Sequence, residues 1–208
     1  MNICENYNEI DYHEIIDCIV SALDAKDPYT AGHSQRVSDM SLAVCHLLGF
    51  SKESTQKIHI AAHLHDIGKI GVSDAILNKG GRLTEEEWEA IKRHPEIGAE
   101  ILSKSHHLNE LKEIVLSHHE RFDGKGYPAG LKAEEIPVGA RIIAICDSID
   151  AMTSNRCYRK AHSLEFCYQE IERNLGIMYD PMIGRYVLDH WDEVVQILHC
   201  SNCQESYE

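Results

Sequence analysis

Hydrophobic residues recur along this chain with the spacing of α-helices. Between residues 15 and 23, and again between 37 and 48, apolar side chains stand at positions i, i+3, i+4 and i+7, so they share one face of a helix. The sequence TEEE at 84–87 is a capping box that predicts a helix through Ile91, and Pro95 can open another to about Leu102. No convincing strand-like alternation is found, so the pattern predicts an all-α fold.

The second half of the chain continues this period around one long irregular segment. Apolar residues keep helical spacing over 111–118, and Asp180 followed by Pro181 predicts a last helix to about Leu198. Residues 121–137, RFDGKGYPAGLKAEEIP, are too rich in glycine and proline for a helix and are expected to form a loop. Loops of this length are often functional. We expect one domain over 12–198, with a short N-terminal extension at 1–11 and a C-terminal tail at 199–208.

The predicted helix over 138–153 is apolar on two sides and should therefore be buried. One stripe starts at Val138 and Ile142, and the second holds Asp147 between Ala144 and Ala151. A lone carboxylate in a core is costly or becomes neutral, so Asp147 needs a partner. A bound cation is the simplest such partner.

Composition and charge restrict the function. The net charge of −14 at pH 7 argues against duplex nucleic acid, because proteins that hold a duplex by its phosphates carry a basic face. Apolar runs stay below the roughly 20 residues of a transmembrane helix, and the polar, acidic start of the chain is unlike a signal peptide. Cys18, Cys45, Cys146 and Cys167 fall in apolar helical stretches, which is typical of reduced thiols in a core. The single CxxC at 200–203 lacks the second cysteine pair that a zinc ribbon needs. We expect a cytoplasmic protein without a membrane span.

The chain holds fourteen histidines in 208 residues. Seven of them stand near polar neighbours and are expected at the surface: His13, His46, His59, His106, His107, His162 and His190. The neighbours of His63, which lies two residues before His65, do not decide whether it is a surface residue or part of a site. Five others, with the aspartates Asp66 and Asp147, take what look like inward-facing helix positions or lie beside helix ends: His33, His65, His94, His118 and His119. So many unpaired polar groups could not share a dry core, so these seven side chains are predicted to form a site.

The chemistry of these seven side chains indicates transition metals. Imidazole and carboxylate ligands together suit iron, manganese, zinc or nickel better than magnesium or calcium. Seven ligands are too many for one ion but natural for two ions that share a bridging aspartate. Two ions about 3.5–4 Å apart form the usual clamp for hydrolysing a phosphate ester, since they activate a water and stabilise the oxygens of an in-line displacement.

Five motifs in this order resemble the HD-GYP branch of the HD-domain phosphohydrolases: His33, HDIGK at 65–69, HPEIG at 94–98, HHERFDGKGYP at 118–128 and DSIDAMTSNRCYR at 147–159. The resemblance covers about residues 12–190. It implies an HD-domain helical bundle with a long GYP loop, and a centre of two or three metal ions that often holds iron or manganese. It also implies hydrolysis of cyclic di-GMP to pGpG and, by a second cut, to GMP. Gly68 in HDIGK is expected to end its helix.

The resemblance further implies roles for individual residues. The ligands of one metal ion would be His33, His65, Asp66 and Asp147. The ligands of the second would be the bridging Asp66 with His94, His118 and His119. Asp66 and Lys69 would be catalytic, with Lys69 facing the reacting phosphate, where its charge could stabilise the developing negative charge. The carboxylates of Asp27 and Asp150 would support the ligands from behind.

Substrate contacts are implied in the second half of the chain. Arg156 and Arg159 match basic positions that the family uses on the ligand phosphates, a task that suits the planar fork of arginine. Arg121 is a further candidate. Tyr127 of the GYP motif could stack on or hydrogen-bond a guanine, or its loop could contact a signalling protein. Both possibilities stay open, as does a homodimer.

Tyr29 stands where some members of the family have a glutamate that supports a third metal, so two ions are expected in this protein. Members usually carry a sensory or receiver domain before this unit, so the regulatory input is expected outside this chain. Two other functions stay open: the same chemistry on another cyclic dinucleotide such as cyclic GMP-AMP, and a non-catalytic signalling adaptor. An adaptor would be expected to lose metal ligands or Lys69, and this chain keeps them all.

Overall fold

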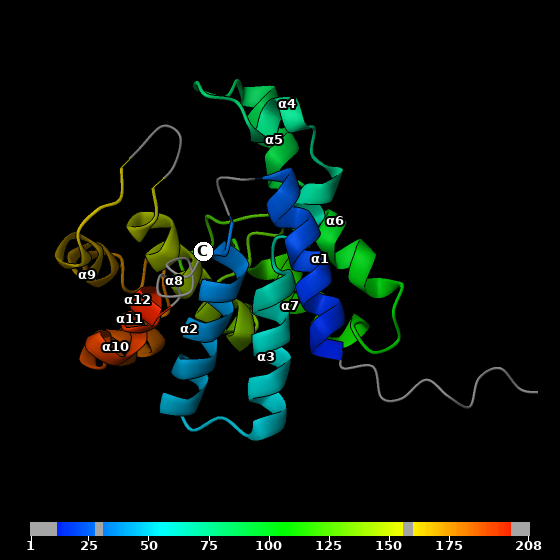
Figure 1. Ribbon diagram of the computed structural model, residues 1–208. Helices are drawn as coiled ribbons and strands as arrows, with labels where there is room; N and C mark the ends of the chain where they lie inside the picture. The colour runs from blue at the N-terminus through cyan, green and yellow to red at the C-terminus, as the bar shows by residue number, and fades with distance from the viewer. Residues whose placement is uncertain (1–11, 28–30, 156–159, 201–208) are drawn as a thin grey trace, which may run out of the picture.

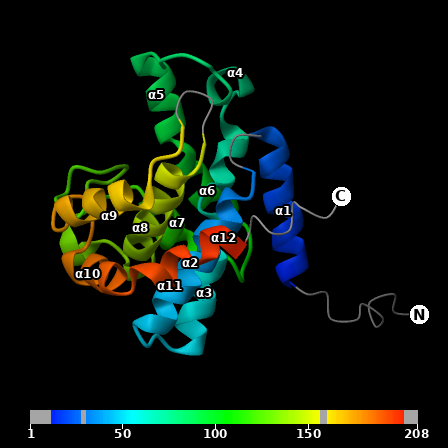
Figure 2. The same ribbon diagram turned by 60° about the vertical axis from the view of Figure 1, so that its left-hand side comes forward.

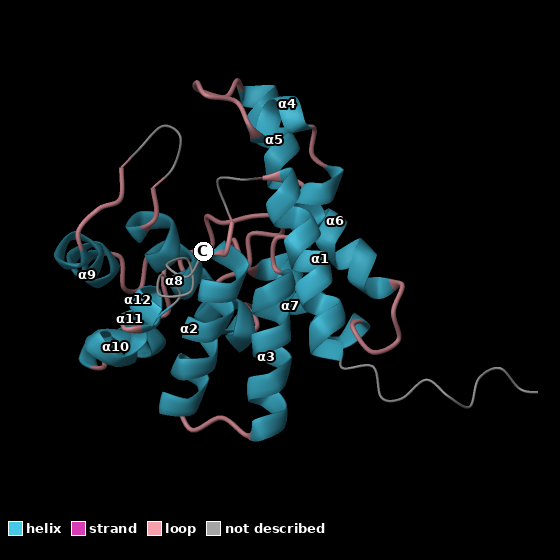
Figure 3. Ribbon diagram, viewed as in Figure 1, coloured by secondary structure: helices cyan, strands magenta, loops and turns pink. Residues whose placement is uncertain are grey.

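The computed structural model describes residues 12–27, 31–155 and 160–200. Within those residues helices are the regular structure, and the only strand-like pairing is an isolated bridge between Leu175 and Tyr179 (Figure 3). The predicted all-α fold is confirmed. No helix in the described part of the chain is long and apolar enough to cross a membrane.

The helices follow one another along the chain, with the longest connection between α7 and η4, and 3-10 helices are marked η. They are α1 (Tyr12–Lys26), α2 (His33–Leu47), α3 (Lys52–Leu64), η2 (Ile67–Gly71), α4 (Asp74–Leu77), α5 (Glu85–Lys92), α6 (His94–Ser103), η3 (Asn109–Leu111), α7 (Lys112–Ser117), η4 (Ala133–Glu135), α8 (Val138–Thr153), α9 (Leu164–Arg173), α10 (Pro181–Asp189), α11 (Trp191–Val195) and α12 (Ile197–Cys200).

The helices pack around α8. The neighbouring helices α2 and α3 stand side by side, and both contact α8, as do α7 and α9 (Figures 1 and 2). Helix α1 lies along α3 and η2 on one flank, whereas α9 to α12 cover the other (Figure 1). The buried apolar residues of α8 include Ile142, Ile143, Ile145 and Ile149, each with no exposed surface. The predicted burial of this helix is confirmed, and it carries Asp147 into the interior of the bundle.

The predicted caps are present, but the predicted last helix is divided. Thr84 and Glu87 form the reciprocal capping box, and the Asp180 side chain accepts hydrogen bonds from the backbone of Met182 and Ile183. The single helix to Leu198 was wrong: the chain forms α10, α11 and α12, with a break at His190. The break lets the chain change direction while apolar residues on both sides of it stay buried.

Gly68 has a packing role and does not end a helix. Helix α3 ends at Leu64, and Gly68 lies inside η2. A Cβ atom at position 68 would stand 1.9 Å from the carbonyl oxygen of His94 and 2.6 Å from the amide nitrogen of Gly98. Glycine therefore lets η2 touch the backbone of α6, which brings the HD motif next to His94.

Two smaller predictions can be compared with the structure. The segment 121–137 is irregular apart from the short η4, so the predicted loop is confirmed. Cys45, Cys146 and Cys167 are buried as expected, but Cys18 is exposed, because it lies on the solvent-facing side of α1. Cys203 lies outside the described residues.

Candidate metal centre

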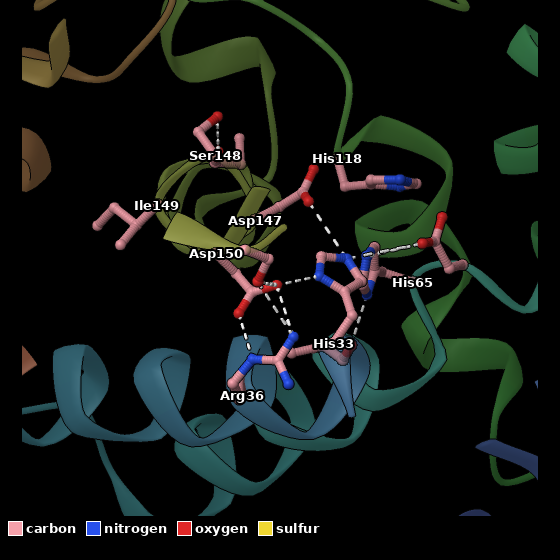
Figure 4. A network of polar contacts seen from close by, with 12 residues as sticks. His33, Arg36, His65, His118, Asp147, Ser148, Ile149 and Asp150 are labelled. Carbon is pink, nitrogen blue, oxygen red and sulfur yellow. Dashed lines mark hydrogen bonds and ion pairs between the residues drawn. The ribbon is translucent and has the colours of Figure 1, made fainter. Parts of the chain in front are cut away.

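The seven predicted ligands converge from five parts of the bundle. His33 is the first residue of α2, His65 and Asp66 follow α3, and His94 begins α6. His118 and His119 follow α7, whereas Asp147 comes from the middle of α8. Helix ends thus surround one buried point of α8, and the predicted gathering of these side chains is what the structure contains (Figure 4).

One half of the centre, named the carboxylate side, consists of His33, His65 and Asp147. His33 Nε2 lies 3.3 Å from Asp147 Oδ1 and 3.7 Å from Asp66 Oδ2. His65 Nε2 lies 3.4 Å from the same oxygen of Asp66. One ligand atom each of His33, His65 and Asp66 falls within 4.8 Å of the others, which is the separation that a shared ion needs.

The other half, named the imidazole side, consists of His94, His118 and His119. The Nε2 atoms of His94 and His118 are 3.2 Å apart, and a nitrogen of His119 joins them within 4.8 Å. Asp66 faces this side through its second oxygen, since Oδ1 lies 3.3 Å from His94 Nε2. The carboxylate of Asp66 therefore directs one oxygen to each side, the geometry of a bridging ligand.

The imidazole rings are oriented for binding through Nε2. The Nδ1 atoms of His65, His94 and His118 donate to backbone carbonyls at 2.7, 2.8 and 2.6 Å, those of Ala62, Ile91 and Val115 respectively. Such a bond fixes the tautomer and leaves the Nε2 lone pair for a metal. Within the described chain, the buried Nε2 of His65 has no hydrogen-bond partner. The donor set and this orphaned nitrogen fit a metal centre.

Burial sets the protonation of the imidazole side. Burial lowers the pKa of His94, His118 and His119, to about 3 for His119, and the neighbouring imidazoles contribute. These rings are therefore neutral at pH 7, as metal ligands must be.

The carboxylate side is more strongly charged. Burial opposes ionisation of Asp66 and Asp147, but Lys69 and the facing imidazoles hold the pKa of Asp66 well below its usual value, and His33 does so for Asp147. Burial also opposes the protonation of His33, but its hydrogen bonds to Asp147 and Asp150 raise its pKa to about 9. Metal binding at this side should therefore release a proton from His33.

Lys69 lies beside the bridge. Its Nζ is 2.7 Å from Asp66 Oδ2, and 19% of the side chain is exposed. Although burial disfavours its charge, Asp66 raises the pKa of Lys69. Lys69 and Asp66 line a small cavity between α1, α2 and η2 that also includes Asp27. The Lys69 ammonium is thus held at the edge of the centre, against the bridging carboxylate.

Asp150 supports His33 from behind, as expected. Its Oδ2 accepts a hydrogen bond from His33 Nδ1 at 2.6 Å (Figure 4). Arg36, which the sequence analysis did not single out, pairs with both oxygens of Asp150 and lies at 3.2 Å from Oδ2 through Nη2. Arg36 is one helical turn after His33, and this i, i+3 spacing is the signal that could have identified it.

The GYP loop packs against the imidazole side. The Tyr127 ring lies on the His119 ring, with centroids 4.9 Å apart and planes inclined by 30°. The buried Glu120, also missed from the sequence, accepts hydrogen bonds from the backbone nitrogens of Ala129 and Gly130 at 2.7 and 3.0 Å. Its position directly after the two ligand histidines could have identified it. Arg121 is engaged in the same loop: it pairs with both carboxylate oxygens of Asp123, at 3.1 and 2.8 Å.

The structure does not place every predicted residue. Arg156, Arg159 and Tyr29 lie outside the described residues, so their assigned roles stay predictions. Of the histidines expected at the surface, His46, His106 and His107 are exposed. The other four lie at the surface but are partly covered by tertiary packing: His13, His59, His162 and His190.

An all-α bundle that gathers five histidines and an aspartate at helix ends around a second aspartate within α8 has the donor set of a helical metal-binding domain. The chain belongs to the HD domain family, whose sequence profile matches residues 17–183. Its motifs resemble those of the HD-GYP branch of that family.

The chain is similar in sequence to several proteins named as cyclic dinucleotide phosphodiesterases. The chain is 41% identical over 186 residues to a cyclic di-GMP phosphodiesterase of Thermotoga maritima, covering 88% of this chain and 50% of that protein. It is 36% identical to a 3′3′-cGAMP-specific phosphodiesterase of Vibrio cholerae, covering 88% of this chain and 36% of the relative. It is 39% identical to the cyclic di-GMP phosphodiesterase response regulator RpfG of Xanthomonas campestris, covering 84% and 47%. The chain thus spans half or less of these relatives' length.

Solved structures show the same fold. The crystal structure of a cyclic GMP-AMP-specific phosphodiesterase of V. cholerae superposes with a TM-score of 0.67 at 20% identity, covering 89% of this chain and 49% of that one. An HD-GYP-type protein of Bdellovibrio bacteriovorus gives 0.62 at 20% identity, covering 86% and 60%.

Proposed function

We propose that this chain is a metal-dependent phosphodiesterase that opens the ring of cyclic di-GMP to pGpG, with a second cut to GMP open to the same site. The observation that carries the proposal is the carboxylate of Asp66, which directs one oxygen to each of two histidine groups. A relative 41% identical over most of this chain, named a cyclic di-GMP phosphodiesterase, supports the substrate class.

The donor set fits two divalent transition-metal ions, iron or manganese. His33, His65, Asp66 and Asp147 would hold one ion, and Asp66, His94, His118 and His119 the other. When bound, such a pair supplies a Lewis acid for the phosphoryl oxygens and lowers the pKa of a water. The mixture of imidazole and carboxylate donors suits iron, manganese, zinc or nickel, and the resemblance to the HD-GYP branch favours iron or manganese among them.

The residues of the chain position the substrate. The Lys69 ammonium, held 2.7 Å from Asp66, would stabilise negative charge that develops on the reacting phosphate. Arg156 and Arg159 would bind phosphate through their planar forks, and Tyr127 would contact a guanine or hold His119 in place. Arg121 is a weaker candidate, because Asp123 already occupies its guanidinium.

A second substrate is supported by particular relatives. Two V. cholerae proteins named as 3′3′-cGAMP-specific phosphodiesterases are 36% and 41% identical to this chain. Both candidate substrates are cyclic dinucleotides with two phosphodiester bonds, so the centre would perform the same reaction on either. They differ in one base, so residues other than the metal ligands would select between the two substrates.

The test is product analysis with the metal-loaded protein. The full chain is loaded anaerobically with Fe²⁺ or Mn²⁺, its metal content is measured, and it is incubated separately with cyclic di-GMP and cyclic GMP-AMP. Chromatography should detect pGpG from cyclic di-GMP at a higher kcat/KM than any product from cyclic GMP-AMP. A higher kcat/KM for cyclic GMP-AMP would show that cyclic GMP-AMP is the preferred substrate. Full metal content with no hydrolysis of either would favour a non-catalytic adaptor.

A further inference from the structure

A second group of histidines lies where α1 packs on α3. His59 and His63 are one turn apart on α3, and His13 of α1 packs against both. His13 Nε2 and His59 Nε2 are 3.0 Å apart. The ring of His63 lies 5.2 Å from that of His13 and 4.7 Å from that of His59, nearly perpendicular to each. One nitrogen from each ring falls within 4.8 Å of the other two.

His63 is buried without any hydrogen bond in the described structure. The side chain has no exposed surface, and neither of its ring nitrogens has a partner among the described residues. Buried polar atoms are nearly always paired, since leaving one unpaired costs the full desolvation of that atom. An imidazole with two orphaned nitrogens, facing two more imidazoles, indicates a ligand among them.

The hydrogen bonds of His59 set its tautomer. Ser38 Oγ donates to the backbone carbonyl of His59 at 3.1 Å, so the same oxygen accepts from His59 Nδ1, which lies 2.7 Å away. The proton of His59 is therefore on Nδ1, and the Nε2 lone pair points at His13. A partner behind the ring is the usual arrangement of a metal-binding histidine. Asp17 lies near His13, with Oδ1 3.6 Å from Nδ1, too far for a hydrogen bond.

We propose that His13, His59 and His63 form a second metal site, distinct from the centre at Asp66, which takes a zinc-like ion through three imidazole nitrogens. Three neutral nitrogens without a carboxylate suit Zn²⁺, Ni²⁺ or Cu²⁺ rather than Mg²⁺ or Ca²⁺. With Zn–N distances of about 2.0–2.1 Å, tetrahedral ligand atoms stand about 3.3 Å apart. The nitrogens of His13 and His59 are already 3.0 Å apart, and one nitrogen of His63 lies within 4.8 Å of both. Solvent would fill the fourth position.

Such an ion would join α1 to α3. Helix α1 packs on α3 and on η2, and η2 carries Lys69. Because the ion would bind the folded arrangement of both helices and not the unfolded chain, its binding would raise the melting temperature. The site would thus hold α1 against the segment that leads into the HD motif.

The test compares two single-histidine variants. The full chain is stripped with a chelator, reloaded with Zn²⁺, desalted and measured by elemental analysis. The proposal expects His13→Ala to retain one zinc ion fewer than the wild type, and His46→Ala, an exposed histidine on α2, to retain as many. The test compares the zinc content of each variant with that of the wild type. Its outcome therefore does not depend on how many ions the Asp66 centre binds. Equal zinc in all three proteins would overturn the proposal, as would zinc that desalting removes from the wild type.

Two further measurements separate a lost site from a damaged fold. Because 43% of the His13 side chain is exposed, His13→Ala should match the wild type in circular dichroism and in the melting temperature of the metal-free protein. In an Asp66→Ala background, added Zn²⁺ should still raise the melting temperature, and His13→Ala should abolish that rise. Ser38→Ala should weaken this zinc by about 10–100-fold, the usual cost of losing a partner behind a ligand. A rise that persists in the double variant would locate the zinc elsewhere.

Discussion

The two sides of the metal centre hold their ligands differently. On the carboxylate side, His33 lies between Asp147 and Asp150, and Arg36 pairs with Asp150 behind it. On the imidazole side, the Nδ1 atoms of the neutral rings of His94 and His118 donate to backbone carbonyls and not to a carboxylate. An ion on the carboxylate side would have more of its charge offset by the protein. We therefore expect the ion on the imidazole side to be the easier to remove and the stronger Lewis acid.

The largest effect is expected where the two sides meet. Asp66→Ala removes the carboxylate that faces both histidine groups, so both ions should be lost and cyclic di-GMP hydrolysis should fall to background. Elemental analysis and product chromatography measure the two outcomes. The control is Asp189→Ala, an exposed aspartate far along the chain, which should behave as the wild type. If Asp66→Ala retained one ion at full occupancy, Asp66 would serve one side and not bridge.

Lys69→Ala should reduce turnover without affecting either side's ion. The ammonium contacts Asp66 but is not a metal ligand, and its loss removes a charge that acts on the reacting phosphate. The expected decrease in kcat is about 100- to 1000-fold, typical for one charge-stabilising donor, with metal content near that of the wild type. Loss of metal as complete as in Asp66→Ala would show that Lys69 maintains the bridge and would remove the argument for catalysis.

Asp150→Asn tests whether the two sides are separable. The substitution weakens the support of His33 and the pairing of Arg36. The ion on the carboxylate side should therefore bind about 10–100-fold more weakly, whereas the ion on the imidazole side keeps its affinity. Titration of the metal-free variant with Mn²⁺, followed by electron paramagnetic resonance, reports both affinities. Equal weakening of both ions would mean that the centre behaves as one unit, and the comparison of the two sides would lose its meaning.

Arg156→Ala and Arg159→Ala should leave the metal content of both sides unchanged and should weaken the binding of the substrate. Loss of one charge-assisted hydrogen bond costs roughly 1.5–3 kcal/mol, or about tenfold to a hundredfold in affinity. The loss should appear in kcat as well if the arginine binds the scissile phosphate, and mainly in KM if it binds the other. Bis(p-nitrophenyl) phosphate has one phosphate and should be insensitive to the arginine that serves the second. Unchanged cyclic di-GMP kinetics in both variants would refute these two assignments.

The sequence predicted that these seven side chains gather, because their setting is local. Asp147 stands within an apolar helix, and paired motifs such as His65-Asp66 stand at the end of one, so the apolar pattern alone made burial without a partner implausible. The helices themselves followed from periodicity and from caps at Thr84 and Asp180. Each of these signals lies within one or two turns of chain.

The missed features depend on contacts between distant segments. Gly68 looked like a helix terminator, but its role comes from the carbonyl of His94 on another helix. His59 and His13 have polar neighbours in sequence, and only the packing of α1 on α3 brings them to 3.0 Å. The break at His190 follows from the need to bury residues on both sides of it. Sequence periodicity describes one helix at a time and carries no information on such contacts.

The smallest effect is expected at Tyr127, whose ring lies 4.9 Å from that of His119 on the imidazole side. Tyr127→Ala removes the surface that holds His119, so the ion on this side should bind about tenfold more weakly, the lower end of the range for supporting residues. Tyr127→Phe keeps the ring and should bind metal as the wild type does. Manganese titration of both variants beside KM for cyclic di-GMP separates two roles of the tyrosine. If the alanine variant binds metal normally but has a raised KM, the ring contacts a base of the substrate. If both variants lose affinity for the ion equally, the hydroxyl group and not the ring surface supports His119.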